Sequence, residues 1–132
     1  MKIIVDSSVW IDYFRNGQNS GILDNLIDEN LIAVNDLILT EIIPPLQLKK
    51  QTRIIDLLNE IENLELHIDW QQIRDFQYMC LKNGINKMGI SDLIIAQNAI
   101  QNNTSIFTLD KHFSLLKTVI GVSVFDQKTL QI

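Results

Sequence analysis

Cysteine, histidine and proline are scarce in this chain. Its single cysteine, Cys80, cannot form an internal disulfide, which excludes a disulfide scaffold and favours a reducing, cytoplasmic environment. One cysteine and two widely separated histidines also provide too few ligands for a zinc site. Only two prolines and five glycines argue against a disordered or fibrous chain. Because Cys80 lies in an apolar helical pattern, we expect a buried, unreactive thiol.

Long hydrophobic runs are absent as well. The first apolar run, Ile3-Ile4-Val5, ends at Asp6 and is too short for a signal peptide, and no stretch approaches the roughly 20 apolar residues of a membrane helix. The length of 132 residues and the hydrophobic content of 46% suit one core, so we expect a single domain over residues 1–132. The net charge of −5 counts mildly against nucleic-acid binding, although a carboxylate cluster that holds cations would also give an acidic total.

Short apolar strands alternate with amphipathic helices along the chain. The periodicity predicts strands at 3–5, 31–34, 64–68, 105–108 and 122–125, and helices at 9–14, 22–27, 37–43, 54–61, 70–81, 92–100 and 112–116. This order predicts an α/β three-layer sandwich around a central parallel sheet of four to five strands. Because Pro44 and Pro45 disfavour helical geometry before them, we expect the third helix to break or kink at Ile43.

Four acidic residues lie in apolar surroundings, unlike the solvated acids elsewhere in the chain. Asp6 ends the first strand, Glu41 lies on the helix after the second, Asp92 begins the buried helix, and Asp110 follows the fourth strand. Any one of them has an ordinary structural explanation, such as a cap, a turn or a salt bridge. Ligands of parallel sheets bind beyond the carboxyl ends of the strands, where three of the four fall, so we expect a shared site.

Carboxylates that converge in one pocket repel one another unless a cation joins them. Hard oxygen ligands select Mg²⁺ or Mn²⁺. An ion of this kind suits phosphodiester hydrolysis, because it lowers the pKa of a bound water and neutralises charge on the phosphate and the leaving oxygen.

Four short motifs resemble those of PIN-domain nucleases of the VapC toxin type. They follow the order of the family: residues 6–15 (DSSVWIDYFR), Thr40-Glu41, residues 91–96 (SDLIIA) and residues 108–113 (TLDKHF). The ordered set spans Lys2 to Phe113 and is fairly specific.

The resemblance implies a Rossmann-like PIN fold with a Mg²⁺ or Mn²⁺ site. It implies an endoribonuclease that leaves a 5′-phosphate and a 3′-hydroxyl, a homodimer, and inhibition by a small cognate antitoxin protein. The motif match assigns the catalytic, metal-binding roles to Asp6, Glu41, Asp92 and Asp110.

Weaker candidates surround these acids. Ser8 and Thr108 match hydroxyl positions that border the site in the family. Arg15 and Lys87 are candidates for contact with a substrate phosphate, although Arg15 has an ordinary partner in Asp12, three residues earlier, and exposed lysines usually need no explanation. The densest basic run has the charge to follow an RNA backbone but is by default a solvated helix face: Lys49, Lys50 and Arg53.

Other small α/β proteins with acids at strand ends fit less well. A phosphoryl-accepting receiver domain needs a pair of acids after the first strand and a lysine after the last, whereas Ser7 and Ser8 follow Asp6, and Asp126 follows the last strand. A phosphatase with an aspartyl nucleophile needs a second aspartate at position 8. The remaining alternative is a PIN-like module that binds RNA or protein without catalysis.

Overall fold

A five-stranded parallel sheet organises the computed structural model, which describes residues 2–126. Its order is β3-β2-β1-β4-β5, with Ile3 of β1 opposite Ile32 of β2 and Ile4 opposite Ile106 of β4. Nearly every residue of the three central strands is buried, as expected for strands covered on both faces. The strands are β1 (Ile3–Val5), β2 (Ile32–Val34), β3 (Glu62–Asn63), β4 (Ser105–Phe107) and β5 (Ser123–Val124).

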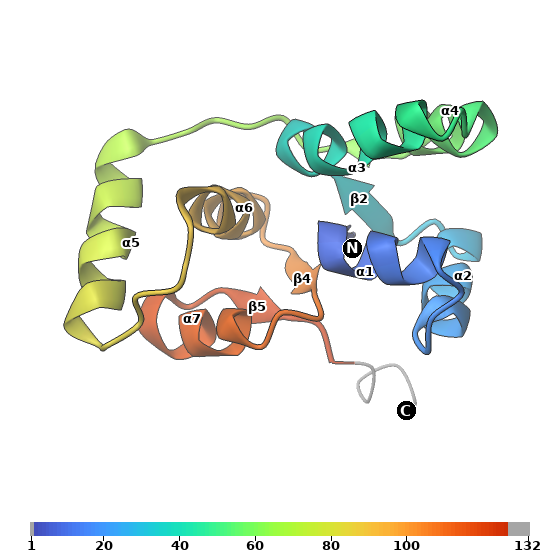
Figure 1. The fold of residues 1–132 in the computed structure, drawn as a ribbon. Helices are drawn as coiled ribbons and strands as arrows, with labels where there is room; N and C mark the ends of the chain where they lie inside the picture. The colour runs from blue at the N-terminus through green and yellow to red at the C-terminus, as the bar shows by residue number, and fades with distance from the viewer. Residues whose placement is uncertain (1, 127–132) are drawn as a thin grey trace.

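Helices cover both faces of this sheet (Figure 1). The chain moves outward from β1 to β3 and then returns to β4 and β5 on the other side, so right-handed crossovers place two groups of helices on opposite faces. One group is α1 (Ser7–Phe14), α2 (Ser20–Asp28), α3 (Asp36–Leu48) and α4 (Thr52–Glu60). The other is α5 (Trp70–Lys82), α6 (Ile90–Gln101) and α7 (His112–Ile120). The predicted three-layer α/β sandwich is therefore confirmed.

Of the break or kink predicted at Ile43, the break is wrong, because the third helix continues past this residue. α3 continues through Pro44 and Pro45 to Leu48. Ile42 and Leu46, one turn apart on either side of the prolines, are buried in the core and hold the helix against α1. The carbonyl groups that lose an amide donor to proline belong to two exposed residues, where water can replace the missing bonds.

The segment between β3 and α5 is not a strand, which corrects the prediction at 64–68. Beyond Asn63 the backbone makes one further bond to β2, from the Leu64 amide to the Val34 carbonyl (2.8 Å), because β2 ends there. Amide side chains of α6 bind this segment instead: Asn98 donates to the Glu65 carbonyl (3.1 Å), and Gln101 donates to that of His67 (2.8 Å).

α6 is the central buried helix, with every residue from Leu93 to Ala99 buried. Cys80 on α5 is buried too, and burial raises the pKa of its thiol, as expected for an unreactive cysteine. Among residues 2–126, no helix has both the length and the apolar character that a membrane crossing requires.

Candidate active site

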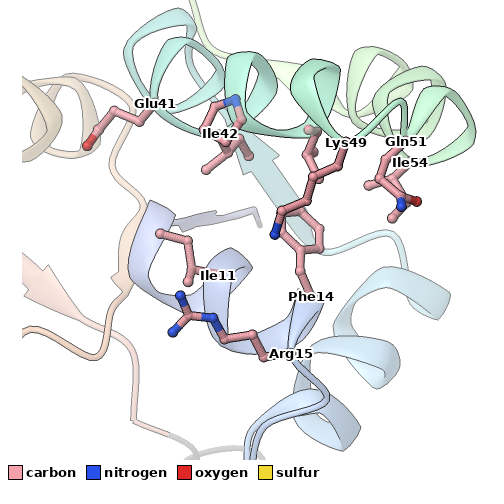
Figure 2. Close-up of a pocket in the computed structure, with 10 residues that line it drawn as sticks. Ile11, Phe14, Arg15, Glu41, Ile42, Lys49, Gln51 and Ile54 are labelled. Atoms are coloured by element: carbon pink, nitrogen blue, oxygen red, sulfur yellow. The ribbon is translucent and has the colours of Figure 1, made fainter.

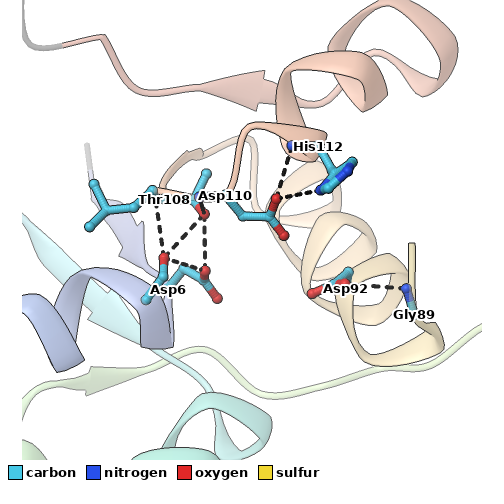
Figure 3. Close-up of polar contacts among 8 residues, drawn as sticks. Asp6, Gly89, Asp92, Thr108, Asp110 and His112 are labelled. Atoms are coloured by element: carbon cyan, nitrogen blue, oxygen red, sulfur yellow. Dashed lines mark hydrogen bonds and ion pairs between the residues drawn. The ribbon is translucent and has the colours of Figure 1, made fainter. Parts of the chain in front are cut away.

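The four predicted acids come from four different elements near the carboxyl ends of β1 and β4. Glu41 projects from α3 (Figure 2), whereas Asp6 follows β1, Asp92 lies in the first turn of α6, and Asp110 precedes α7 (Figure 3). The sequence separates the first and last of them by about a hundred residues, and the pairing of β1 with β4 brings them together.

Asp6 is the most buried of the four, with 5% of its surface exposed. Its backbone amide donates to the Phe107 carbonyl (2.9 Å), which joins the ends of β1 and β4. Its Oδ2 accepts hydrogen bonds from the hydroxyls of Ser8 (2.9 Å) and Thr108 (3.0 Å). The two hydroxyls predicted to border the site therefore hold this carboxylate in place.

The same hydroxyls are themselves fixed by the loop after β4. The Leu109 amide donates to the Ser8 Oγ, and the Asp110 amide donates to the Thr108 Oγ1, each over 3.0 Å. Each hydroxyl thus accepts a backbone bond and donates its own proton to Asp6, which fixes the direction of both hydrogen bonds.

Asp110 is held by His112 (Figure 3). Its Oδ1 accepts from the His112 backbone amide (2.9 Å) and lies 2.8 Å from the His112 Nδ1. The acid therefore binds the first turn of α7 and also contacts the imidazole of His112.

Asp92 is the third residue of α6, and its Oδ2 accepts from the Gly89 amide (3.2 Å). Gly89 is the N-cap of this helix, which begins at Ile90, two residues earlier than the sequence predicts. Partial burial raises the pKa of Asp92; the Gly89 bond and the His112 charge oppose the rise, while the charges of Asp6 and Asp110 add to it.

Glu41 lies in the second turn of α3. The Ser7 hydroxyl lies 3.5 Å from its Oε2, the limit for a hydrogen bond. Partial burial raises the pKa of Glu41, and the charges of Asp6 and Asp92 raise it further. The influence of these charges places the three acids within electrostatic range of one another. Ser7 is a neighbour of the site that the sequence analysis did not assign.

All four carboxylates share one pattern. In each, one oxygen binds the protein, and within residues 2–126 the other accepts no hydrogen bond. None of the four pairs with a lysine or arginine of those residues; the one ion pair is between Asp110 and His112.

This donor set has the chemistry that a hard divalent cation prefers, because within residues 2–126 it offers carboxylate oxygens that accept no hydrogen bond and it has no lysine or arginine partner. In the described part of the chain, however, no three acidic, histidine or cysteine side chains lie close enough to hold one ion. The carboxylates would have to approach one another to share a metal.

The weaker candidates have different positions. Asp12 does not form the expected salt bridge with Arg15. Its Oδ2 instead accepts a hydrogen bond from the Asn19 amide (3.3 Å). The Asp12 side chain also lies against Gly17, where the Cβ of any other residue would collide with it. Lys87 is exposed in the segment before α6 and has no hydrogen bond or ion pair with the four acids.

Comparisons with known proteins agree with this architecture. The PIN domain family model matches residues 3–118. Ribonuclease VapC1 of Methanocaldococcus jannaschii is 32% identical over 129 residues, which cover 96% of this chain and 88% of the relative. The crystal structure of VapBC2 from Rickettsia felis, bound to a promoter DNA fragment, superposes with a TM-score of 0.74 at 18% identity, covering 95% of this chain and 98% of that one. FitAcB from Neisseria gonorrhoeae gives 0.71 at 20% identity, covering 94% and 96%. The family model and the archaeal relative each extend over most of the sequence, and this chain therefore belongs to the PIN domain family.

Proposed function

We propose that this protein is a metal-dependent endoribonuclease and the toxin of a toxin–antitoxin pair. The observation that carries the proposal is the group of four acids at the carboxyl ends of β1 and β4. Each keeps one oxygen without a hydrogen bond inside residues 2–126, and none has a lysine or arginine partner there. Partial burial and the charges of neighbouring acids raise the pKa of Glu41 and of Asp92, and carboxyl groups perturbed in this way are typical of a binding or catalytic site.

In this proposal Asp6, Glu41, Asp92 and Asp110 hold Mg²⁺ or Mn²⁺. When bound, the ion supplies an activated water and offsets charge on the phosphate and the leaving oxygen. The chain itself provides the positions: Ser8 and Thr108 fix Asp6, the Gly89 amide fixes Asp92, and His112 fixes Asp110.

The proposal of a toxin role draws on the relatives. The archaeal relative that covers most of this chain is a ribonuclease named VapC1, and assemblies of VapBC type share the fold. We propose that this chain likewise forms a homodimer, binds a small cognate antitoxin and acts on RNA in the cytoplasm. A short open reading frame for such a partner beside the gene would support the toxin role over a housekeeping nuclease.

The test compares RNA cleavage by the wild type, Asp92→Asn and Asp75→Asn. Asp75 is a matched control because it is an exposed acid on α5 that bonds only to Gln71. We expect cleavage with Mg²⁺ or Mn²⁺, none with chelator, and a loss on the order of 10²-fold or more for Asp92→Asn, with Asp75→Asn unchanged. Cleavage that survives both chelator and Asp92→Asn would contradict the proposal. RNA binding without cleavage by the wild type would instead favour the non-catalytic module.

A further inference from the structure

A groove lies beside the acids, between α1, α3 and the start of α4. It encloses about 400 Å³, and its walls are mostly apolar. Along α3 it runs from Glu41 past Pro45, which lie four residues apart on one helix face, to Lys49 at the end of the helix. Across from them lie Phe14, the last residue of α1, and Arg15, which follows it. Because Glu41 belongs both to the acid cluster and to this lining, the groove leads directly into the candidate active site.

Two positive side chains enter the groove from the ends of two helices. Figure 2 shows Arg15, which follows α1, and Lys49, which follows α3, directed into the space between the two helices. Within residues 2–126, neither charged group makes a hydrogen bond or an ion pair. Lys50 and Arg53, the other members of the basic run, do not line this groove, so the lining singles out Lys49 among them.

The charge of the groove differs from that of the site it adjoins. The four acids repel a phosphodiester, and the chain as a whole carries a net charge of −5. A nucleic acid therefore needs local positive charge to approach the acids, and unpaired cations next to Glu41 provide it. Apolar walls that include an aromatic ring, with two cations beside them, suit a nucleotide, whose base packs on apolar groups while its phosphates bind lysine and arginine.

We propose that this groove binds the single-stranded RNA next to the bond that is cleaved. Arg15 and Lys49 bind its phosphates, and a base packs against Phe14 and the apolar walls. This inference rests on the proposed ribonuclease function and assigns substrate contacts to the same site.

Binding is measured apart from catalysis, by fluorescence anisotropy with a labelled, mixed-sequence 20-nucleotide single-stranded RNA. The protein carries Asp92→Asn to prevent cleavage. The groove pair Arg15→Gln/Lys49→Gln is compared with Arg74→Gln/Lys82→Gln, which removes the same charges from α5 on the opposite face of the sheet. We expect the groove pair to raise the Kd about tenfold and to reduce the slope of log Kd against log salt by about 0.7 for each phosphate that is no longer neutralised. The α5 pair should change the Kd less than about twofold.

Two results would overturn the groove assignment. Equal weakening by both pairs would mean that only the total charge matters. Unchanged RNA affinity in the groove pair, with loss of binding to a co-expressed antitoxin, would assign the groove to a polypeptide. In the otherwise wild-type protein, the groove pair should raise the KM for RNA about tenfold and leave kcat within about twofold.

The binding and cleavage experiments can disprove the groove assignment and the nuclease function separately. A protein that cleaves RNA but binds it equally well without Arg15 and Lys49 disproves the groove and leaves the nuclease function standing. A protein that binds RNA through these two side chains but never cleaves it retains the groove and loses the proposed catalysis.

Discussion

Two polar clusters in this fold differ in whether their side-chain atoms have hydrogen-bond partners. The first, the amide network, consists of Asn35 and Asn98, which bond to each other, and the adjacent Gln97, which bonds separately to Gln72 and to the backbone of Asp69; all three are at most 1% exposed. Asn35 accepts from the Ile38 amide (2.9 Å) and donates to Asn98 (3.0 Å), so the start of α3 is tied to the middle of α6. The acid cluster joins the same two helices through Glu41 and Asp92, yet it leaves carboxylate oxygens without donors in residues 2–126.

This difference in hydrogen bonding distinguishes residues that stabilise the fold from residues that are available to bind a ligand. Buried amides with bonded partners stabilise a unique packing, because any rearrangement leaves buried groups unsatisfied. Half-buried carboxylates with raised pKa values and no basic partner lower stability and are retained where binding or catalysis requires them. The amide network therefore fixes α3 relative to α6, and this positions Glu41 relative to Asp92.

The largest effect is expected from Asn98→Leu in the amide network. This change leaves the buried Asn35 side-chain amide without its partner, at about 1–3 kcal/mol, and removes the hydrogen bond to the Glu65 carbonyl, worth about 1 kcal/mol, so we expect a loss of about 3 kcal/mol in the free energy of unfolding. Chemical denaturation measures it. The control is Gln101→Ala, which removes an exposed bond from the same helix to the same segment and should cost less than about 1 kcal/mol. Equal losses of unfolding free energy in the two variants would show that the buried network contributes no more to stability than an exposed hydrogen bond does.

Divalent ions should stabilise the protein through the acid cluster. At a Mn²⁺ concentration 100 times the Kd, the free energy of unfolding should rise by about 2.7 kcal/mol in the wild type. Glu41→Gln, which removes one acid but keeps the shape of the side chain, should gain much less, whereas Gln101→Ala should gain as much as the wild type. Thermal melts with and without the ion measure the difference. A gain of equal size in Glu41→Gln would mean that the ion binds elsewhere.

The sequence predicted the sheet and the positions of the acids because both depend on local patterns. The apolar runs of β1 and β4 and the acids that follow them determine where Asp6 and Asp110 lie, and parallel pairing then brings them to one edge. Two adjacent amides, Gln97 and Asn98, interrupt the apolar pattern of α6 and were the available signal for the buried network.

The errors arose where partners distant in the sequence override local preference. The alternation at 64–68 resembled a strand, but β2 is too short to pair with it, and side chains of α6 bind its peptide groups instead. Pro44 and Pro45 predicted a break, but buried contacts on both sides of them keep α3 continuous. Neither the length of β2 nor the packing of Ile42 and Leu46 against the core can be seen in a local pattern.

Within the acid cluster, the contact between His112 and Asp110 should affect metal affinity more than folding. The imidazole and the backbone amide both bind Oδ1 and leave Oδ2 available. Removing the side-chain contact with His112→Leu should weaken Mn²⁺ binding about tenfold. His112→Asn should retain most of the affinity, because its amide nitrogen occupies nearly the position of Nδ1. Titration of thermal stability with Mn²⁺ measures both; equal affinities in the two variants would exclude a positioning role for the side chain.

The smallest effect is the most direct contrast with the amide network: Asp92→Asn should stabilise the protein in the absence of metal. The folded-state pKa of Asp92 lies above its ordinary value of 3.8, so the carboxyl group contributes stability below pH 3.8 and loses it as the pH rises through the folded-state pKa. At pH 7 the ionised form carries this penalty, and asparagine removes it while its carbonyl still accepts from the Gly89 amide. Because the group is partly exposed to solvent, we expect a gain of only about 0.5 kcal/mol at pH 7, which disappears below about pH 3.8. Asp75→Asn should give no gain at either pH. Destabilisation by Asp92→Asn at pH 7 in chelator would mean that favourable contacts hold the carboxylate, as they hold Asn98, and the distinction between the two clusters would be lost.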